Sequence, residues 1–356
     1  MKKKLIMIII SIFFVFLLVI SATYVYYEAS LDAVDNSNTN EVIINIEAGS
    51  FASEIISLLK ENDLIKNELT MRIYAKTVGG TPMAGRYVFS KSMNANSIWN
   101  DIISGNVKND TVWITFVEGK RLTYIKKQIA SFFPYTEDEI DAVLEDKDYI
   151  NSLIEKYDVL TENILDKNIY HSLEGYLFPD TYEFARDASI KDIIEKMIST
   201  LDAKMSKYSS EISNSKFSIH KILTLASIIE LEGARSDDRN GVSGVFYNRL
   251  NSGWTLGSDV TTYYAVNKDF SEDLSRSELN SCNAYNTRGA CVKGLPIGPI
   301  ASVSIKSIES ALNPTKHDYY YFVADKNGKT YFSKTDSEHN KIIRELQSNG
   351  LWYTYK

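Results

Sequence analysis

The stretch ILTLASIIELE, residues 222–232, decides how the chain is interpreted, and we expect it to form a helix in a domain core. At about 100° per residue, its large aliphatic side chains fill one continuous arc. Glu232 falls near the middle of that arc, and Glu230 falls at its edge. Burial disfavours the ionised form of a carboxyl group and raises its pKa, as a proton donor at neutral pH requires. The pattern makes Glu232 a candidate catalytic acid.

The same residues have a structural interpretation. If the helix ends before Glu232, that carboxylate is solvated, and glutamates in the last turn of a helix are usually surface residues. The helical pattern alone leaves both interpretations open.

The segment that follows also places a charged residue on an apolar helix face. We expect a second helix, capped by Asp237 or Asp238, in which Arg249 falls among the apolar side chains. A buried guanidinium needs a carboxylate or a ligand, and Glu230, Glu232 or Asp259 could serve. Alternatively, the stem of Arg249 covers the core while its head reaches water.

Three Gly- and Pro-rich loops follow, at residues 254–259, 284–287 and 294–300. Their amide, hydroxyl and aromatic groups, including Tyr285 and Asn286, suit the recognition of a sugar. The Gly-Leu-Pro and Gly-Pro pieces are equally typical of simple turns.

The rest of the large segment, residues 107–356, predicts mixed helices and strands. Residues 172–182, SLEGYLFPDTY, are too rich in Gly and Pro for a helix and too aromatic for a solvated loop. Asn327-Gly328 between two aromatic runs predicts a hairpin whose turn needs positive φ at both centres. Capping boxes are expected from the pairs Thr136/Glu139 and Thr335/Glu338.

Residues 41–106 predict a separate small module. Strands are expected at 42–46 and 85–89. One helix is expected to begin near residue 50, and a second is expected to cover residues 69–76. A third helix is expected to be capped by Asn96 and Ser97 and ended by Gly105.

The N-terminus predicts a membrane anchor. Residues 1–4, which include Lys2, Lys3 and Lys4, are expected to form a cytoplasmic tail. Residues 5–27 are long and apolar enough to span a bilayer, and residues 28–40 are expected to form a polar linker. This orientation places the remainder outside the cytoplasm. The competing interpretation is a cleaved secretory signal, although no clear small-residue cleavage site follows.

Composition limits the other function classes. The net charge of −7 argues against nucleic-acid binding. The four histidines show no metal-ligand spacing, so we expect neither a metal nor another cofactor. Cys282 and Cys291 lie nine residues apart and form either a disulfide or two free thiols.

Five ordered blocks resemble the MltG (YceG-like) family of endolytic murein transglycosylases. The blocks are SLEGYLFPDTY at 172–182, LASIIELE at 225–232, GVFYNRL at 244–250, AYNT with GLPIGPI within 284–300, and YYYFVADKNGKTYFSKTDSEHN at 319–340. The resemblance implies an α+β protein with a transmembrane helix, a LysM-like module at 41–106 and a larger mixed α/β catalytic domain at 107–356.

The resemblance also implies an activity: cleavage within peptidoglycan glycan strands that leaves 1,6-anhydro-muramic ends. The family's catalytic glutamate is the second acid of an E-x-E pattern, which is Glu232 here, and Glu230, the first acid of the pattern, is the fallback. Arg249, Asp259, Tyr285 and Asn286 are candidates for holding the sugar or tuning that acid.

Other implications and departures follow from the same blocks. Glu174 lies in a family block without an evident role. The implied partners are the glycan strand, the cell membrane and cell-wall synthases. Leu231 replaces a usually polar residue, Gly257 replaces a common glutamine, and the two cysteines bracket a short insertion.

Two rival functions stay open at this stage. One is a non-catalytic glycan-binding scaffold for cell-wall synthases, and the other is a lysozyme-type hydrolase, whose product is one water heavier. A metalloprotease fits poorly because suitable metal ligands are lacking.

Overall fold

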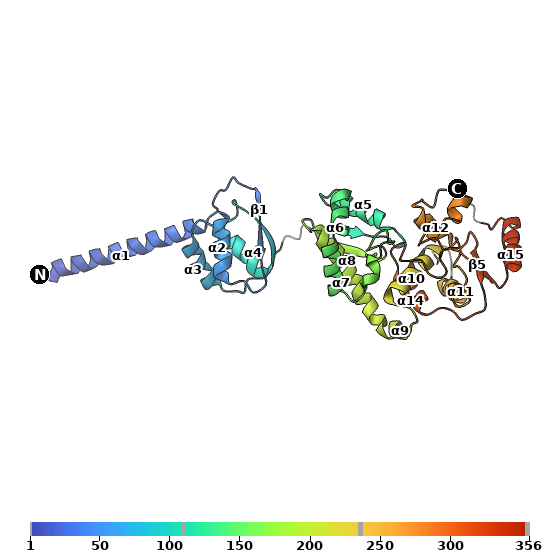
Figure 1. The fold of residues 1–356 in the computed structure, drawn as a ribbon. Helices are drawn as coiled ribbons and strands as arrows, with labels where there is room; N and C mark the ends of the chain where they lie inside the picture. The colour runs from blue at the N-terminus through green and yellow to red at the C-terminus, as the bar shows by residue number, and fades with distance from the viewer. Residues whose placement is uncertain (1, 108–110, 234–237, 353–356) are drawn as a thin grey trace. The chain divides into compact units, whose positions relative to one another are not determined.

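The computed structural model describes residues 2–107, 111–233 and 238–352, which form two compact units (Figure 1). The first unit is Met1–Asp110 and the second is Thr111–Lys356. The candidate cap Asp237 lies outside the described residues. Mixed helix and strand content agrees with the expected α+β class, although each sheet among the described residues has only two strands.

The first unit begins with one long helix, α1 (Lys2–Leu31). Its segment Ile10–Leu31 is 22 residues long and apolar enough to cross a membrane, a test that buried helices and signal sequences also pass. The expected linker from residue 28 is wrong at its start, because the helix continues to Leu31. That side chain is only 3% exposed and packs in the core of the unit, which makes the added turn favourable.

The small module after α1 consists of one two-stranded sheet and three helices. Strands β1 (Glu41–Ile46) and β2 (Gly85–Ser90) are antiparallel, with Ile44 opposite Tyr87. The helices are α2 (Ala52–Glu61), α3 (Glu68–Val78) and α4 (Ala95–Ser104).

The expected cap of α4 is wrong by two residues. The side chain of Asn94, rather than Asn96 or Ser97, accepts the hydrogen bond from the backbone N–H of Ser97, over 2.8 Å. Gly105 ends the helix in the left-handed region, as expected.

The second unit opens with a strand and a helical region. Strand β3 (Thr111–Thr115) pairs with β4 (Thr181–Ala185), and residues 173–179 before β4 are all buried, as their aromatic composition predicts. The remaining elements of this half are α5 (Leu122–Phe132), α6 (Glu137–Leu144), α7 (Lys147–Lys156), the 3₁₀ turns η1 (Glu162–Leu165) and η2 (Ser206–Tyr208), α8 (Ile190–Met205) and α9 (Ser209–Asn214).

Helix α10 (Ile219–Gly233) is central to the C-terminal half and packs against α11 (Arg239–Asn251), α12 (Asp259–Ala265) and α14 (Ile305–Leu312). Asp238 caps α11 through the N–H of Gly241, over 2.7 Å. The other elements are α13 (Arg276–Leu279), β5 (Tyr321–Ala324), β6 (Thr330–Ser333) and α15 (Asp336–Ser348). Both expected capping boxes form.

The hairpin β5–β6 is present, but its turn differs from the expected one. Gly328 has φ +87°, whereas Asn327 is not among the described residues with positive φ. The carboxylate of Asp325 instead accepts hydrogen bonds from the N–H groups of Asn327 and Lys329. These side-chain bonds stabilise a longer connection that needs only one left-handed residue.

Candidate functional site

Helix α10 keeps its helical form through Gly233, so the alternative in which the helix ends before Glu232 is excluded. The helix is buried on every face from Ile222 to Glu230, not along one arc. The predicted burial order of the two glutamates is therefore reversed. Glu230 is 4% exposed, whereas Glu232 is half-buried at the end of the helix.

Glu232 faces the loop that precedes α12. Its Oε1 accepts a hydrogen bond from the hydroxyl of Ser258, over 2.6 Å. Burial raises the pKa of Glu232, and the bond from Ser258 opposes that shift because it favours the charged form. Nearby Asp259 also raises this pKa, whereas Arg249 and Arg288 lower it. The carboxyl group is therefore surrounded by groups that raise its pKa and groups that lower it.

Glu230 is held by a different set of groups. Its Oε2 accepts hydrogen bonds from the backbone N–H of Ser304, over 2.8 Å, and from the Ser304 hydroxyl. Ser304 is the N-cap of α14, where a negative charge is favourable. Arg239 lies 3.5 Å from Oε1. These bonds indicate a structural carboxylate that joins α10 to α14.

Arg249 is half-buried, and its guanidinium donates to backbone carbonyl groups. The two sequence-based alternatives were a carboxylate partner and a guanidinium that reaches water. The Nε of Arg249 donates to the backbone carbonyl of Tyr320 over 2.7 Å, and its Nη1 donates to the carbonyl of Leu256. The guanidinium also lies over the ring of Tyr321, 5.3 Å from its centroid. Arg249 therefore joins the loop before α12 to strand β5.

The remaining substrate-binding candidates divide into two groups. Asp259 is exposed and forms an ion pair with Arg288. Tyr285 and Asn286 are fully buried, so neither is placed to touch a sugar in this structure. The hydroxyl of Tyr285 accepts from the N–H of Tyr170, and the Asn286 amide donates to backbone carbonyls, including that of Ser281. Their observed contacts organise the loop itself.

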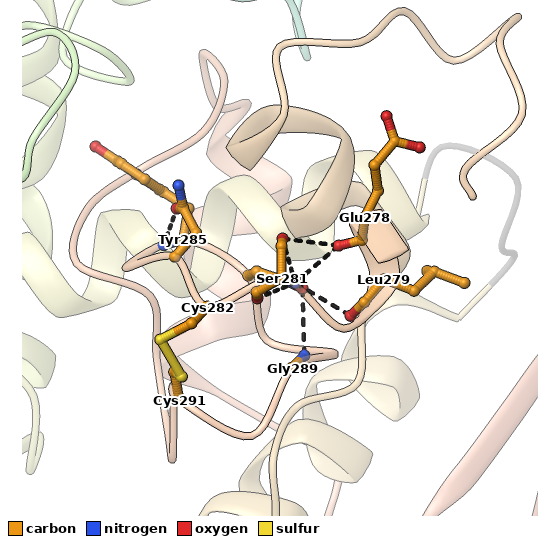
Figure 2. The surroundings of a disulfide bond; sticks show 9 residues. Glu278, Leu279, Ser281, Cys282, Tyr285, Gly289 and Cys291 are labelled. Carbon is orange, nitrogen blue, oxygen red and sulfur yellow. Dashed lines mark hydrogen bonds between the residues drawn. A yellow bond between two sulfur atoms is a disulfide. The ribbon is translucent and has the colours of Figure 1, made fainter. Parts of the chain in front are cut away.

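A disulfide between Cys282 and Cys291 closes this loop, which settles the alternative left open by the sequence (Figure 2). The loop contains Thr287, whose hydroxyl accepts from the N–H of Ser258 over 3.2 Å. Its backbone carbonyl accepts from Gly257, over 3.0 Å. The loop therefore supports Ser258, the residue that donates to Glu232.

Glu174, which had no role from the sequence, is a buried cap. One oxygen accepts from the backbone N–H of Leu122, in the first turn of α5, and the other accepts from the hydroxyl of Tyr264. Only 2% of the residue is exposed. Burial raises the pKa of Glu174 to about 7, although the hydrogen bonds and Arg121 oppose the shift.

Metal chemistry gains no support from the arrangement. Within residues 2–107, 111–233 and 238–352, no cluster of His, Cys, Asp and Glu could hold a metal ion.

Ser258 and Trp254 lie in the loop at 254–259 that the sequence indicated as suited to a sugar, but neither was named as a site residue. Ser258 carried a weak signal, since a hydroxyl group directly precedes Asp259 in a Gly-rich loop. Trp254 stood in the same loop, and its side chain is exposed. The contact between Ser258 and Glu232 could not be predicted from the sequence, because it joins distant segments of the chain.

Comparison with known proteins now adds to this geometry. The family model described as the YceG-like family matches residues 44–345, and the chain belongs to this family. A Bacillus subtilis protein named endolytic murein transglycosylase is 40% identical over 335 residues, which cover 93% of this chain and 92% of the relative.

Two further proteins are similar to this chain. A Streptococcus pneumoniae protein with the same name is 32% identical over 95% of this chain and 65% of the relative. The crystal structure of a YceG-like protein from Listeria monocytogenes matches with a TM-score of 0.62 and 36% identity, over 85% of this chain and 99% of the other.

Proposed function

We propose that the chain is an endolytic murein transglycosylase, a lyase that cleaves the bond between N-acetylmuramic acid and N-acetylglucosamine within peptidoglycan strands. Family membership and the names of its relatives support the reaction class. The single observation that supports the choice of acid is the position of Glu232. It is half-buried, has a raised pKa and receives a hydrogen bond from Ser258.

In the proposed reaction, protonated Glu232 gives its proton to the glycosidic oxygen as the bond from C1 to that oxygen breaks. The resulting carboxylate then takes the proton of the C6 hydroxyl, whose oxygen attacks C1 within the same sugar. The new C1–O6 bond closes the 1,6-anhydro ring and restores the acid. No water enters the product, and the intramolecular attack replaces the second carboxylate that ordinary glycosidases use.

A group in this role must both release and regain one proton. The opposing influences on Glu232 suit that requirement, because burial and Asp259 favour the neutral form while Ser258, Arg249 and Arg288 favour the charged form. Glu230 fits the role less well, since both of its oxygens face structural partners.

The small module at residues 41–106 and α1 complete the proposal. We assign α1 as an uncleaved single-pass anchor, with the basic N-terminus in the cytoplasm and the chain after residue 27 outside it. We assign residues 41–106 as a LysM-like module that holds glycan near the membrane. Cell-wall synthases are the proposed protein partners.

The decisive experiment compares Glu232→Gln with Glu230→Gln in the detergent-purified full chain, using purified sacculi as substrate. We expect Glu232→Gln to abolish release of anhydro-muropeptides, a loss of at least about 10²-fold, because general acid–base catalysis contributes that much. Glu230→Gln should retain activity if it still folds, which circular dichroism and thermal unfolding would check.

Mass spectrometry of the products supplies the second criterion. Products heavier by one water would identify a hydrolase and contradict the lyase reaction. Full activity of Glu232→Gln, together with loss of activity in a folded Glu230→Gln protein, would overturn the assignment of the acid.

A further inference from the structure

Trp254 presents an aromatic surface four residues before Ser258, which donates to Glu232, and has no assigned role. It is 44% exposed and lies just after α11, in the turn that leads to Ser258. Gly253 has φ +70°, and the N–H of Trp254 donates to the carbonyl of Arg249 over 2.9 Å. This backbone geometry fixes where the tryptophan leaves the helix. A single exposed aromatic residue needs no explanation by itself, so the surroundings must decide.

The indole is supported by other rings. The centroids of Trp254 and Tyr320 lie 5.0 Å apart with an interplanar angle of 41°, and Tyr321 meets the indole edge-on at 6.2 Å. The hydroxyl of Tyr320 is hydrogen-bonded to Ser252 over 2.9 Å. The exposed indole therefore rests on an ordered support, which lowers the entropy lost when a ligand stacks on it.

Arg249 connects this aromatic cluster to the candidate acid. Its guanidinium holds the carbonyls of Tyr320 and Leu256 together. Leu256 is two residues before Ser258, which donates to Glu232. The indole and the carboxyl group are thus positioned by one short and well-bonded segment, residues 254–258.

We propose that Trp254, supported by Tyr320, is a sugar-stacking subsite that binds a pyranose ring of the glycan strand next to the bond cleaved at Glu232. The C–H groups on one face of a pyranose form an apolar surface that matches an exposed aromatic ring. The ring's hydroxyl and N-acetyl groups stay in water or meet the polar groups of the loop. This inference rests on the proposed function, because it takes the glycan as the ligand.

Binding can be measured apart from the reaction. The full chain carrying Glu232→Gln is titrated with purified peptide-free glycan strands, and the dissociation constant is compared with that of the same protein carrying Trp254→Ala as well. We expect the tryptophan loss to weaken binding roughly tenfold, as for other aromatic stacking contacts. Trp254→Phe should restore most of the affinity.

Trp113 provides a matched control. It is 61% exposed on β3, so Trp113→Ala removes an indole that is more accessible than that of Trp254 and that the proposal does not use. This change should leave the dissociation constant unaltered. In the otherwise native enzyme, Trp254→Ala should raise KM about tenfold and change kcat by less than about threefold.

The outcomes separate the two proposals. Unchanged glycan binding by a folded Trp254→Ala protein overturns the stacking subsite, whatever the enzyme's activity. Equal weakening by Trp113→Ala and Trp254→Ala also overturns it, because the effect would then be general. Normal stacking at Trp254 combined with full activity of Glu232→Gln would sink the catalytic assignment alone.

Discussion

At the scale of single residues, the hydrogen bond from Ser258 to Glu232 is the contact that most directly controls the candidate acid. A hydroxyl donor stabilises the carboxylate relative to the protonated acid, and it also fixes the direction of the carboxyl group. Burial acts in the opposite sense on the pKa of Glu232. The two roles of the bond, tuning and orientation, have different experimental signatures.

Ser258→Ala should move the basic limb of the pH–activity profile to higher pH. Loss of the donor disfavours the carboxylate, so the pKa of Glu232 rises and the proton needed for catalysis is kept to higher pH. The value of kcat at the optimum should fall about tenfold because the carboxyl group loses its orientation. Ser258→Thr, which keeps a hydroxyl, should restore the native profile.

An unshifted profile in Ser258→Ala would mean that the bond does not act on the titrating acid. Thermal unfolding of both variants serves as the control, since Ser258 is buried and a folding defect must be separated from a catalytic one.

Glu174 makes a separate prediction about stability. Its folded pKa of about 7 exceeds the ordinary value of 4.5, so the folded state binds more protons between these pH values. Stability should therefore fall as the pH rises through this window, by a few kcal/mol in total. In Glu174→Gln this loss should disappear, so the variant gains on the native protein between pH 5 and 8.

Urea unfolding at a series of pH values would measure this effect. Glu155→Gln is the matched control, because Glu155 is exposed on α7 and its replacement should leave the pH dependence intact. Parallel curves for Glu174→Gln and the native chain would contradict the buried-carboxylate explanation.

At the scale of elements, the prediction of α10 was right in position and wrong in its surroundings. The sequence placed the helix and both glutamates correctly, because periodicity and the absence of Gly or Pro before Gly233 are local signals. It could not reveal that α11, α12 and α14 cover the helix on several sides. Glu230 is buried against Ser304 and Arg239, which lie outside α10. The periodicity of the helix cannot predict such contacts.

The loop closed by the disulfide is a second element whose role depends on tertiary contacts. Both cysteines are exposed, whereas Thr287 between them is buried against Ser258. A ten-residue closed loop is expected to contribute about 2–3 kcal/mol of stability through the unfolded state. From the sequence alone, the pairing of the cysteines stayed open and this connection to Glu232 could not be seen.

Removal of the disulfide should therefore reduce both stability and activity. Cys282→Ser/Cys291→Ser should lower kcat several-fold, because Thr287 supports Ser258 less firmly. Treatment of the native chain with a reductant should reproduce the loss, while the double variant should be insensitive to the reductant. A native enzyme with equal activity before and after verified reduction would show that the loop needs no covalent closure.

At the scale of the whole molecule, sequence patterns predicted two folded parts and a long apolar N-terminal helix. The module's strands and helices were found within a few residues, since capping and alternation are local. The end of α1 was missed because its last turn is polar in part and is stabilised by packing of Leu31 in the module core.

Leu31→Ala tests this connection. Loss of a buried leucine should lower the free energy of unfolding of the first unit by about 2–5 kcal/mol. Leu69→Ala, at a position 68% exposed on α3, should cost far less. Hydrogen exchange of the module amides in the full chain would report the difference, and equal protection in the two variants would contradict the packing role of Leu31.

Helix α1 leads directly into the small module, and this limits how far the module can lie from a membrane that the helix crosses (Figure 1). The 22 residues from Ile10 to Leu31 rise about 33 Å, close to the thickness of a bilayer's hydrocarbon core. A bilayer crossed by this helix would leave almost no stalk above the lipid headgroups. The small module at residues 41–106 would then rest on the membrane surface and turn with its anchor, so any glycan it holds would have to come down to that height.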